Sequence, residues 1–180
     1  MSKSEKRYKP GKILITEDEI RTRAGEIGRR ISDDFAGEEV LVVGILKGAF
    51  MWMCDVIKNI SLPVRVDFIA VSSYGASTKS SGVVRILKDL DNAIEDKNVI
   101  LIEDIVDSGV TLNYLREHLL SRGPKALRIC TLLDKPAGRR TAVRVDYTGF
   151  TVDDVFIIGY GLDVNQRYRN LPYITAAVED

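Results

Sequence analysis

The sequence contains little histidine and little cysteine, and these shortages exclude several kinds of site. His118 is the only histidine in 180 residues, so a multi-histidine zinc or iron site is excluded and a Ser-His-Asp triad has one candidate base. It lies in a helical stretch, Tyr114–Leu120, where we expect a solvated side chain. Cys54 and Cys130 lie far apart in apolar segments. We expect buried thiols there rather than a disulfide or a metal pair.

The sequence also lacks a net charge and a long apolar run. Lys and Arg number 26, as do Asp and Glu, so the basic surface typical of nucleic-acid or anionic-membrane binding is not expected. No apolar run approaches the roughly 20 residues that cross a bilayer, and the charged segment Met1–Tyr8 has no apolar signal region. We therefore expect a cytoplasmic protein with a small-molecule partner, no nucleic acid and no membrane.

Apolar residues occur instead in short runs. Hydrophobic residues make up 45% of the chain, which is enough for the core of one domain over residues 1–180. Of five short β-rich runs, most are nearly continuous rather than alternating, as expected for strands buried on both faces of a parallel sheet. These runs are Val40–Ile45, Val64–Ser72, Val99–Ile102, Leu127–Leu133 and Val155–Ile158.

Helix-length segments separate several of these runs. Gly48–Asn59 and Val110–Ser121 each follow a strand, and Glu17–Phe35 precedes the first strand. This alternation predicts an α/β fold with an open, mostly parallel sheet flanked by helices. The polar segment Ser72–Gly82 is either a functional lid or a plain surface loop.

The strongest motif follows the run Val99–Ile102. Glu103 and Asp104 place two carboxylates at its end, and Asp107–Thr111 then turns into the next helix. Ligands of open parallel sheets bind beyond the carboxyl ends of the strands, and a helix N-terminus offers free N–H groups to an anion. A 5′-phosphate fits this turn, because Gly109 allows close backbone approach. Two acids alone would equally suit an N-cap cluster or a solvated strand end, but the whole combination is specific.

Two common nucleotide-binding motifs are absent. The Walker spacing G-x-x-x-x-G-K-[ST] does not occur, and Gly159-Tyr160-Gly161 lacks the third glycine of a dinucleotide fingerprint. The segment Ile100–Thr111 instead resembles the phosphoribosyl pyrophosphate signature of the type I phosphoribosyltransferases. Four more segments are similar to those of the bacterial hypoxanthine (guanine) phosphoribosyltransferases, and the likeness extends from Leu14 to Ile174. They are Gly44–Gly48, Ser72–Gly75, Leu133–Pro136, and Phe156–Asp163 with Arg167–Arg169.

The resemblance implies a fold and a reaction. The fold is that of the type I phosphoribosyltransferases, with a small hood that binds the base and comes from the chain ends. The enzyme would transfer the 5-phosphoribosyl group from phosphoribosyl pyrophosphate to N9 of hypoxanthine or guanine. The products would be IMP or GMP and pyrophosphate, as in purine salvage, and the protein would be a homodimer or homotetramer. The apolar helix Ala49–Met53 suits either a subunit interface or the core.

The resemblance also implies roles for residues in and near the turn Asp107–Thr111, called the phosphate turn below. Glu103 and Asp104 would bind the ribose hydroxyls, directly or through Mg²⁺, which prefers carboxylate and phosphate oxygens. Asp107 would also accept the N7 proton of the purine and so make N9 a better nucleophile. Nearby carboxylates would stabilise positive charge at the anomeric carbon. The 5′-phosphate would be held by Asp107, Ser108, Gly109, Val110 and Thr111.

Further residues would bind the pyrophosphate. Lys47 and Gly48 resemble the family's pyrophosphate loop, where we expect a cis Leu46–Lys47 peptide, because such bonds mark functional sites. On its own, Lys47 would more simply be a solvated residue of a strand-to-helix turn. By resemblance, Arg169 would be a second pyrophosphate ligand and Asp163 a second metal-side carboxylate.

The resemblance likewise points to a lid and a base site. Ser73 and Tyr74 would close over the reacting groups and exclude water. Lys135 would donate to the 6-oxo group, Phe156 would stack on the ring, and Ile157 would offer backbone groups. Without the resemblance, an aromatic residue such as Phe156 in an apolar strand belongs to the core.

Two alternatives remain open. A paralogous enzyme could use xanthine or a pyrimidine, because only the Lys135 and Phe156 segments address the base. A regulator that binds RNA or DNA could share the fold, although the balanced charge and an isoelectric point near 6.6 disfavour it.

Overall fold

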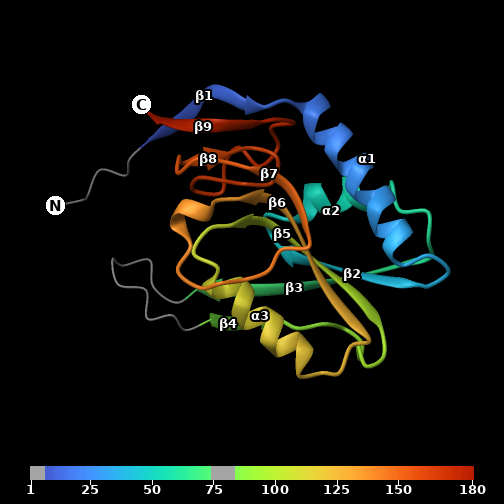
Figure 1. Cartoon of the computed structure of the whole chain (residues 1–180). Helices are drawn as coiled ribbons and strands as arrows, with labels where there is room; N and C mark the ends of the chain where they lie inside the picture. The colour runs from blue at the N-terminus through green and yellow to red at the C-terminus, as the bar shows by residue number, and fades with distance from the viewer. Residues whose placement is uncertain (1–6, 74–83) are drawn as a thin grey trace.

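The computed structural model describes residues 7–73 and 84–180 (Figure 1). Strands and helices alternate over much of the described chain. The elements are β1 (Tyr8–Ile15), α1 (Glu17–Asp34), β2 (Val40–Leu46), α2 (Phe50–Ile57), β3 (Val64–Ser73), β4 (Val84–Lys88), β5 (Asn98–Val106), α3 (Val110–Leu120), β6 (Ala126–Asp134), the 3-10 turn η1 (Pro136–Gly138), β7 (Tyr147–Thr151), β8 (Ile157–Ile158) and β9 (Ile174–Glu179).

The main sheet has six strands in the order β4-β3-β2-β5-β6-β7. Only the β3–β4 pair is antiparallel, so the predicted open, mostly parallel sheet is confirmed. In register, Val40 of β2 lies opposite Val64 of β3 and Asn98 of β5. The carboxyl ends of these strands therefore meet at one edge of the sheet, at the left of Figure 1 where β3 ends.

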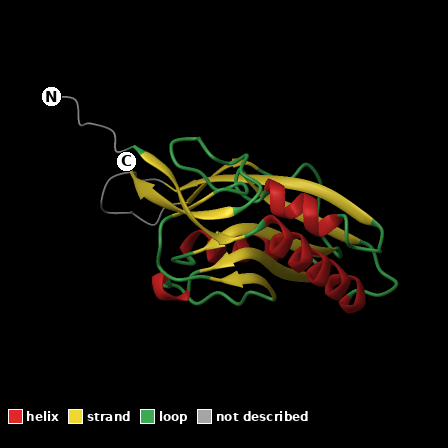
Figure 2. Ribbon diagram, turned by 90° about the horizontal axis from the view of Figure 1, so that it is seen from above, coloured by secondary structure: helices red, strands yellow, loops and turns green. Residues whose placement is uncertain are grey.

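Helices cover both faces of the main sheet, as Figures 1 and 2 show. Val42 and Ile100 pack in the core that contains residues of α1 and α2, whereas Val43 and Leu101 pack in the core that contains residues of α3. Successive strand residues point to opposite faces. Burial on both faces explains why these strands are continuous apolar runs in the sequence.

Helix α1 begins at a capping box. The Glu19 N–H donates to Thr16 Oγ1 over 3.3 Å, and the Thr16 N–H donates to Glu19 Oε2 over 2.8 Å, which satisfies two N–H groups at the start of the helix. Ile20, Ile27 and Ile31 are buried along one side. This spacing of three or four residues is the periodicity of a helix with one apolar face.

Both ends of the described chain form a second, smaller sheet in the order β1-β9-β8, at the top of Figure 1. The prediction that the chain ends form a small region beside the main sheet is confirmed, whereas its role in binding the base stays a prediction. The expected parallel strand Val155–Ile158 was wrong: only Ile157–Ile158 form a strand, antiparallel to β9. Val155 and Phe156 are exposed, and β7 is instead the edge of the main sheet beside β6.

The two cysteines differ in environment. Cys130 is buried, as predicted, and burial raises the pKa of its thiol to about 12. Cys54 is exposed, so the prediction that its thiol is buried was wrong. The buried residues of α2 are instead Trp52, Met53 and Val56. His118 is only partly exposed and lies against Arg122, 2.5 Å from Nε2 to Nη2. Among the described residues, no helix is long and apolar enough to span a membrane.

Candidate active site

Two acidic residues lie at the carboxyl end of β5, as the sequence predicts. Glu103 is buried, and its Oε1 accepts a hydrogen bond from the Asp104 N–H over 3.0 Å. Burial and the charge of Asp104 raise the pKa of Glu103 well above its ordinary value. Burial also raises the pKa of Asp104, although Arg169 opposes that effect. Such shifted carboxyl groups are typical of functional sites, because ionising them in the empty protein costs free energy.

The turn after β5 has the shape of an anion site. Gly109 is the N-cap of α3, with φ 78°, and makes no side-chain capping bond. The first N–H groups of α3 can therefore bind an anion, and the helix dipole favours negative charge there. A Cβ at Gly109 would lie 2.5 Å from the Thr141 carbonyl oxygen, so both the backbone angle and the close packing require glycine.

The loop after β2, which we predict to bind pyrophosphate, lies directly against Asp104. The Leu46–Lys47 peptide is cis, which confirms that expectation. A Cβ on Gly48 would lie 1.4 Å from Asp104 Oδ2, and a Cβ on Gly161 would lie 2.1 Å from the Gly48 carbonyl oxygen. The ends of β2 and β5 and the loop after β8 thus converge.

Two cations lie in this convergent region. Lys47 Nζ donates to Gln166 Oε1 over 3.2 Å, and Arg169 Nη2 donates to the same oxygen over 3.3 Å. Arg169 also pairs with Asp163 over 2.6 Å, and Asp163 Oδ2 accepts from the Gln166 N–H over 2.8 Å. The Gln166 amide oxygen therefore accepts hydrogen bonds from both Lys47 and Arg169, two cations that are suited to bind a polyphosphate.

Gln166 has no role in the sequence prediction. It lies 119 residues from Lys47, in a loop where Asn165, Gln166 and Tyr168 have positive φ. Asp163 and Asn165, which precede Tyr168, are typical turn residues, but only the fold shows which side chain the turn brings to Lys47.

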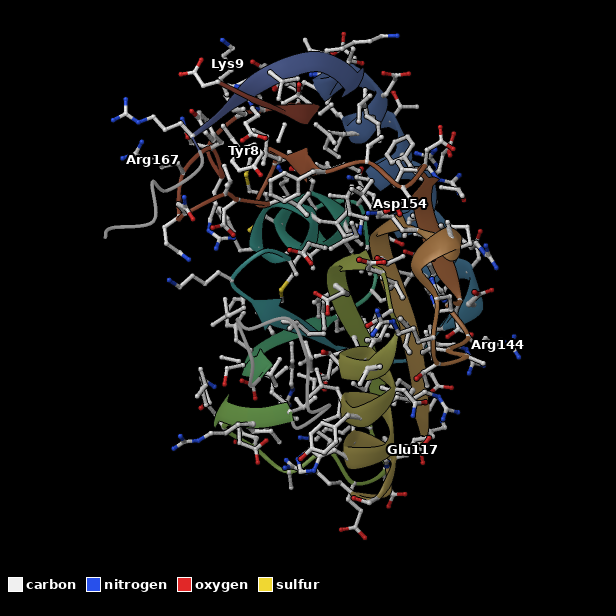
Figure 3. All side chains as sticks on the ribbon, turned by 90° about the vertical axis from the view of Figure 1, so that its left-hand side faces the viewer. Tyr8, Lys9, Glu117, Arg144, Asp154 and Arg167 are labelled. Atoms are coloured by element: carbon white, nitrogen blue, oxygen red, sulfur yellow. The ribbon has the colours of Figure 1, made fainter. Side chains whose placement is uncertain are left out.

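The predicted base site lies where β6 ends. The buried Lys135 donates from Nζ to the Val155 carbonyl oxygen over 3.2 Å and pairs with Asp154 over 2.8 Å. Phe156 is 50% exposed and meets the ring of Tyr8 edge to face at 5.1 Å. Figure 3 shows Tyr8 and Asp154 in the upper part of the view and Glu117 of α3 in the lower part. Phe156 is therefore not a core residue, and half of it is accessible to solvent; its stacking on a base stays a prediction.

Ile157 is buried in β8 and pairs in register with Ala176, which fixes its backbone beside Phe156. The predicted lid is described only at its start. Ser73 ends β3, whereas Tyr74 and residues 75–82 lie outside the described residues. The lid stays a prediction.

The residues that could hold magnesium are the carboxylate pair. Within residues 7–73 and 84–180, no group of three or more His, Cys, Asp or Glu side chains could hold a metal, and Asp163 faces Arg169. Mg²⁺ commonly takes only one or two carboxylates, with waters and substrate phosphates completing its shell. Glu103 and Asp104 fit this pattern, because a cation between them would offset the repulsion that raises the pKa of Glu103.

Comparison with known proteins defines the class. A family model described as the phosphoribosyl transferase domain matches residues 14–165. The chain belongs to this family, and the α/β fold and strand-end site described above are consistent with it.

Its relatives define the group within the family. The chain is 49% identical over 163 residues to the hypoxanthine-guanine phosphoribosyltransferase of Bacillus subtilis, covering 91% of each chain. It is 47% identical to the hypoxanthine phosphoribosyltransferase of Salmonella typhimurium, over 92% of this chain and 94% of the relative. A crystal structure of a Bacillus anthracis hypoxanthine-guanine phosphoribosyltransferase matches with a TM-score of 0.89 and 43% identity, covering 96% of this chain and 100% of the other.

Proposed function

We propose that this enzyme transfers the 5-phosphoribosyl group from phosphoribosyl pyrophosphate to N9 of hypoxanthine or guanine, giving IMP or GMP and pyrophosphate. One observation carries the proposal. The Asp104 carboxylate lies against Gly48, is influenced by the charge of Arg169, and precedes the phosphate turn by a few residues. Groups suited to a ribose, a 5′-phosphate and a pyrophosphate thus meet in one place. The names of the relatives support the purine substrates.

The proposed roles follow the charges of the site. The turn Asp107–Thr111 binds the 5′-phosphate, and Glu103 and Asp104 hold the ribose hydroxyls. Lys47, with the backbone of Gly48, and Arg169 bind the pyrophosphate. As the glycosidic bond to pyrophosphate breaks, positive charge grows at the anomeric carbon, and the nearby carboxylates stabilise it.

Magnesium bound to Glu103, Asp104 and substrate oxygens would neutralise charge on the departing pyrophosphate. Asp163 is the proposed carboxylate near a second metal position. Asp107 accepts the proton from N7 of the purine, which makes N9 a better nucleophile. Asp107 is exposed at the end of β5, so its carboxylate is accessible to a bound base.

Recognition of the base follows from donors and stacking. Lys135 donates to the 6-oxo oxygen, because an ammonium has three donors and no acceptor. Its partner Asp154 is 70% exposed, so that carboxylate can move aside into solvent when a base binds. Phe156 stacks on the purine ring, and Ile157 contributes backbone groups.

The test is a panel of bases. Consumption of phosphoribosyl pyrophosphate is measured with hypoxanthine, guanine, xanthine, adenine and uracil, with and without Mg²⁺. We expect turnover with hypoxanthine or guanine in Mg²⁺ and little with adenine or uracil. Preferred turnover of xanthine or uracil would identify a paralogous enzyme with a different base specificity and would contradict this proposal.

The proposal includes a cytoplasmic location and a homodimer or homotetramer. The exposed Phe50 at the start of α2 is compatible with a subunit contact. Analytical ultracentrifugation of the full chain at micromolar concentration tests the assembly, and a monomer at all concentrations would contradict it.

A further inference from the structure

A single guanidinium group lies behind the phosphate turn. Arg139 follows η1, and its Nε donates to the Asp107 carbonyl oxygen over 2.9 Å, while its Nη2 donates to the Val106 carbonyl oxygen over 3.3 Å. The same Nη2 pairs with the carboxylate of Asp134. The Arg139 side chain is only 20% exposed. Its planar fork therefore joins the end of β5 to the end of β6.

Backbone groups of the same segment hold the neighbouring carbonyl groups. The Lys135 N–H donates to the Val106 carbonyl oxygen over 2.9 Å. The N–H groups of Arg140 and Thr141 donate to the Ser108 carbonyl oxygen over 2.9 and 3.0 Å. Three successive carbonyl oxygens, those of residues 106–108, thus all bond to residues 135–141.

The geometry of the peptide bond turns this anchoring into an anion site. In a trans peptide the C=O of one residue and the N–H of the next point in opposite directions. Carbonyl groups 106–108 face Arg139 and its neighbours, so the N–H groups of Asp107, Ser108 and Gly109 are directed away from that segment. Successive N–H groups held on one side of a turn form a concave anion site.

We propose that Arg139 is a positioning residue for the 5′-phosphate. It does not contact the phosphate; it fixes the carbonyl groups of residues 106 and 107 so that the N–H groups opposite them converge on the anion. The inference rests on the proposed function, which supplies the phosphate. Arg139 also ties the phosphate turn to Asp134, the residue before Lys135, and so links the phosphate and base sites.

The chain offers a matched control. Arg140 is the next residue and is exposed. Its backbone N–H bonds to the Ser108 carbonyl oxygen, and its side chain makes no hydrogen bond to any described residue. Arg140→Met removes the same charge and keeps that backbone bond. Arg139→Met removes the fork. Arg139→Lys keeps the charge, but an ammonium cannot bond both carbonyl oxygens and the carboxylate in one plane.

The experiment compares GMP with guanosine by isothermal titration calorimetry. The two ligands differ in the 5′-phosphate, so a loss that comes from the phosphate site appears only with GMP. For Arg139→Met we expect GMP affinity to fall roughly tenfold or more, with guanosine affinity unchanged. Arg139→Lys should fall between the wild type and Arg139→Met, and Arg140→Met should match the wild type.

Outcomes separate this inference from the proposed function. Equal losses for GMP and guanosine, or none for GMP, in a folded Arg139→Met variant would overturn the role of Arg139. If that variant does not fold, Asp134→Asn gives the second measurement, because it releases the guanidinium from its carboxylate. It should weaken GMP selectively and less strongly, and an unchanged GMP affinity would overturn the role. Failure of the proposed function would appear separately, as wild-type protein that binds GMP without phosphoribosyl transfer.

Discussion

Gly48→Ala should displace the Asp104 carboxylate. The new Cβ would lie 1.4 Å from Oδ2 and 2.4 Å from Cγ of Asp104, whereas ordinary van der Waals contact begins at 3.4 Å. The carboxylate oxygen must therefore move by about 2 Å. The Gly48 backbone has little room to yield, because its carbonyl oxygen lies against Gly161. The change acts on the site through one side chain.

The size of the expected fall in kcat/KM follows from the bonds that Asp104 is proposed to make to substrate or metal. A hydrogen bond to a charged group contributes about 1.5–3 kcal/mol, so kcat/KM for phosphoribosyl pyrophosphate should fall about 10- to 100-fold. Stability should change little. Gly48 does not have positive φ, and alanine restricts the unfolded chain by about 0.4–1 kcal/mol, which partly offsets the cost of moving the carboxylate.

Steady-state kinetics and thermal unfolding of both proteins test this prediction. Gly25→Ala is the matched control, because it lies inside α1 and its new Cβ would meet nothing closer than 3.4 Å. It should raise the melting temperature slightly through helix propensity and leave kcat/KM unchanged. Wild-type kcat/KM in a folded Gly48→Ala variant would refute the placement of Asp104 in the site.

Three further predictions address other parts of the site. Gly138→Ala would place a Cβ 1.8 Å from Asp107 Oδ1, so it should lower kcat with little change in melting temperature, and equal losses of both would contradict a local effect on Asp107. Because burial raises the pKa of Glu103, its carboxyl group stabilises the empty protein fully only below its unfolded pKa and loses that contribution as pH rises. Glu103→Gln should therefore raise the melting temperature near pH 7 and not near pH 4, and denaturation across pH checks the sign. Lys135→Gln should narrow the difference in kcat/KM between hypoxanthine and adenine, mainly by lowering kcat/KM for hypoxanthine. The expected loss is about tenfold or more, because the lost bond contributes about 1–3 kcal/mol. A wild-type enzyme that uses adenine as readily as hypoxanthine would contradict the role of Lys135.

The buried strands could be predicted from the sequence because burial on both faces leaves continuous apolar runs. The edge strand β7 and the strands β1 and β9 of the smaller sheet could not be predicted in this way. Tyr147–Thr151 includes Gly149 and polar residues, and β1 and β9 alternate between buried and exposed positions only in part. Their strand character comes from pairing partners far along the chain. The prediction of a buried parallel strand at Val155–Ile158 was wrong, because its apolar residues include the exposed Phe156. This exposure fits the proposed stacking role of Phe156.

The site divides in the same way. The two carboxylates, Glu103 and Asp104, lie close in sequence to the phosphate turn Asp107–Thr111, so their chemistry can be predicted before the fold is known. Gln166 and Arg139 are not, because Gln166 bonds Lys47 at a separation of 119 residues and Arg139 bonds the Asp107 carbonyl group at 32. Positioning residues of this kind follow from the fold, because no local pattern specifies which distant backbone they hold.

The double variant Glu103→Gln with Asp104→Asn tests the role of the two carboxylates most directly. Phosphoribosyl transfer to hypoxanthine in Mg²⁺ is measured beside the melting temperature of the same preparation. Because the pair acts at the ribose and its metal, kcat/KM for phosphoribosyl pyrophosphate should fall at least 10²-fold, the combined loss of two charge-assisted contacts of about 1.5–3 kcal/mol each. The melting temperature should stay equal or rise. A folded double variant with unchanged kinetics would contradict the central claim that these carboxylates act on the substrate.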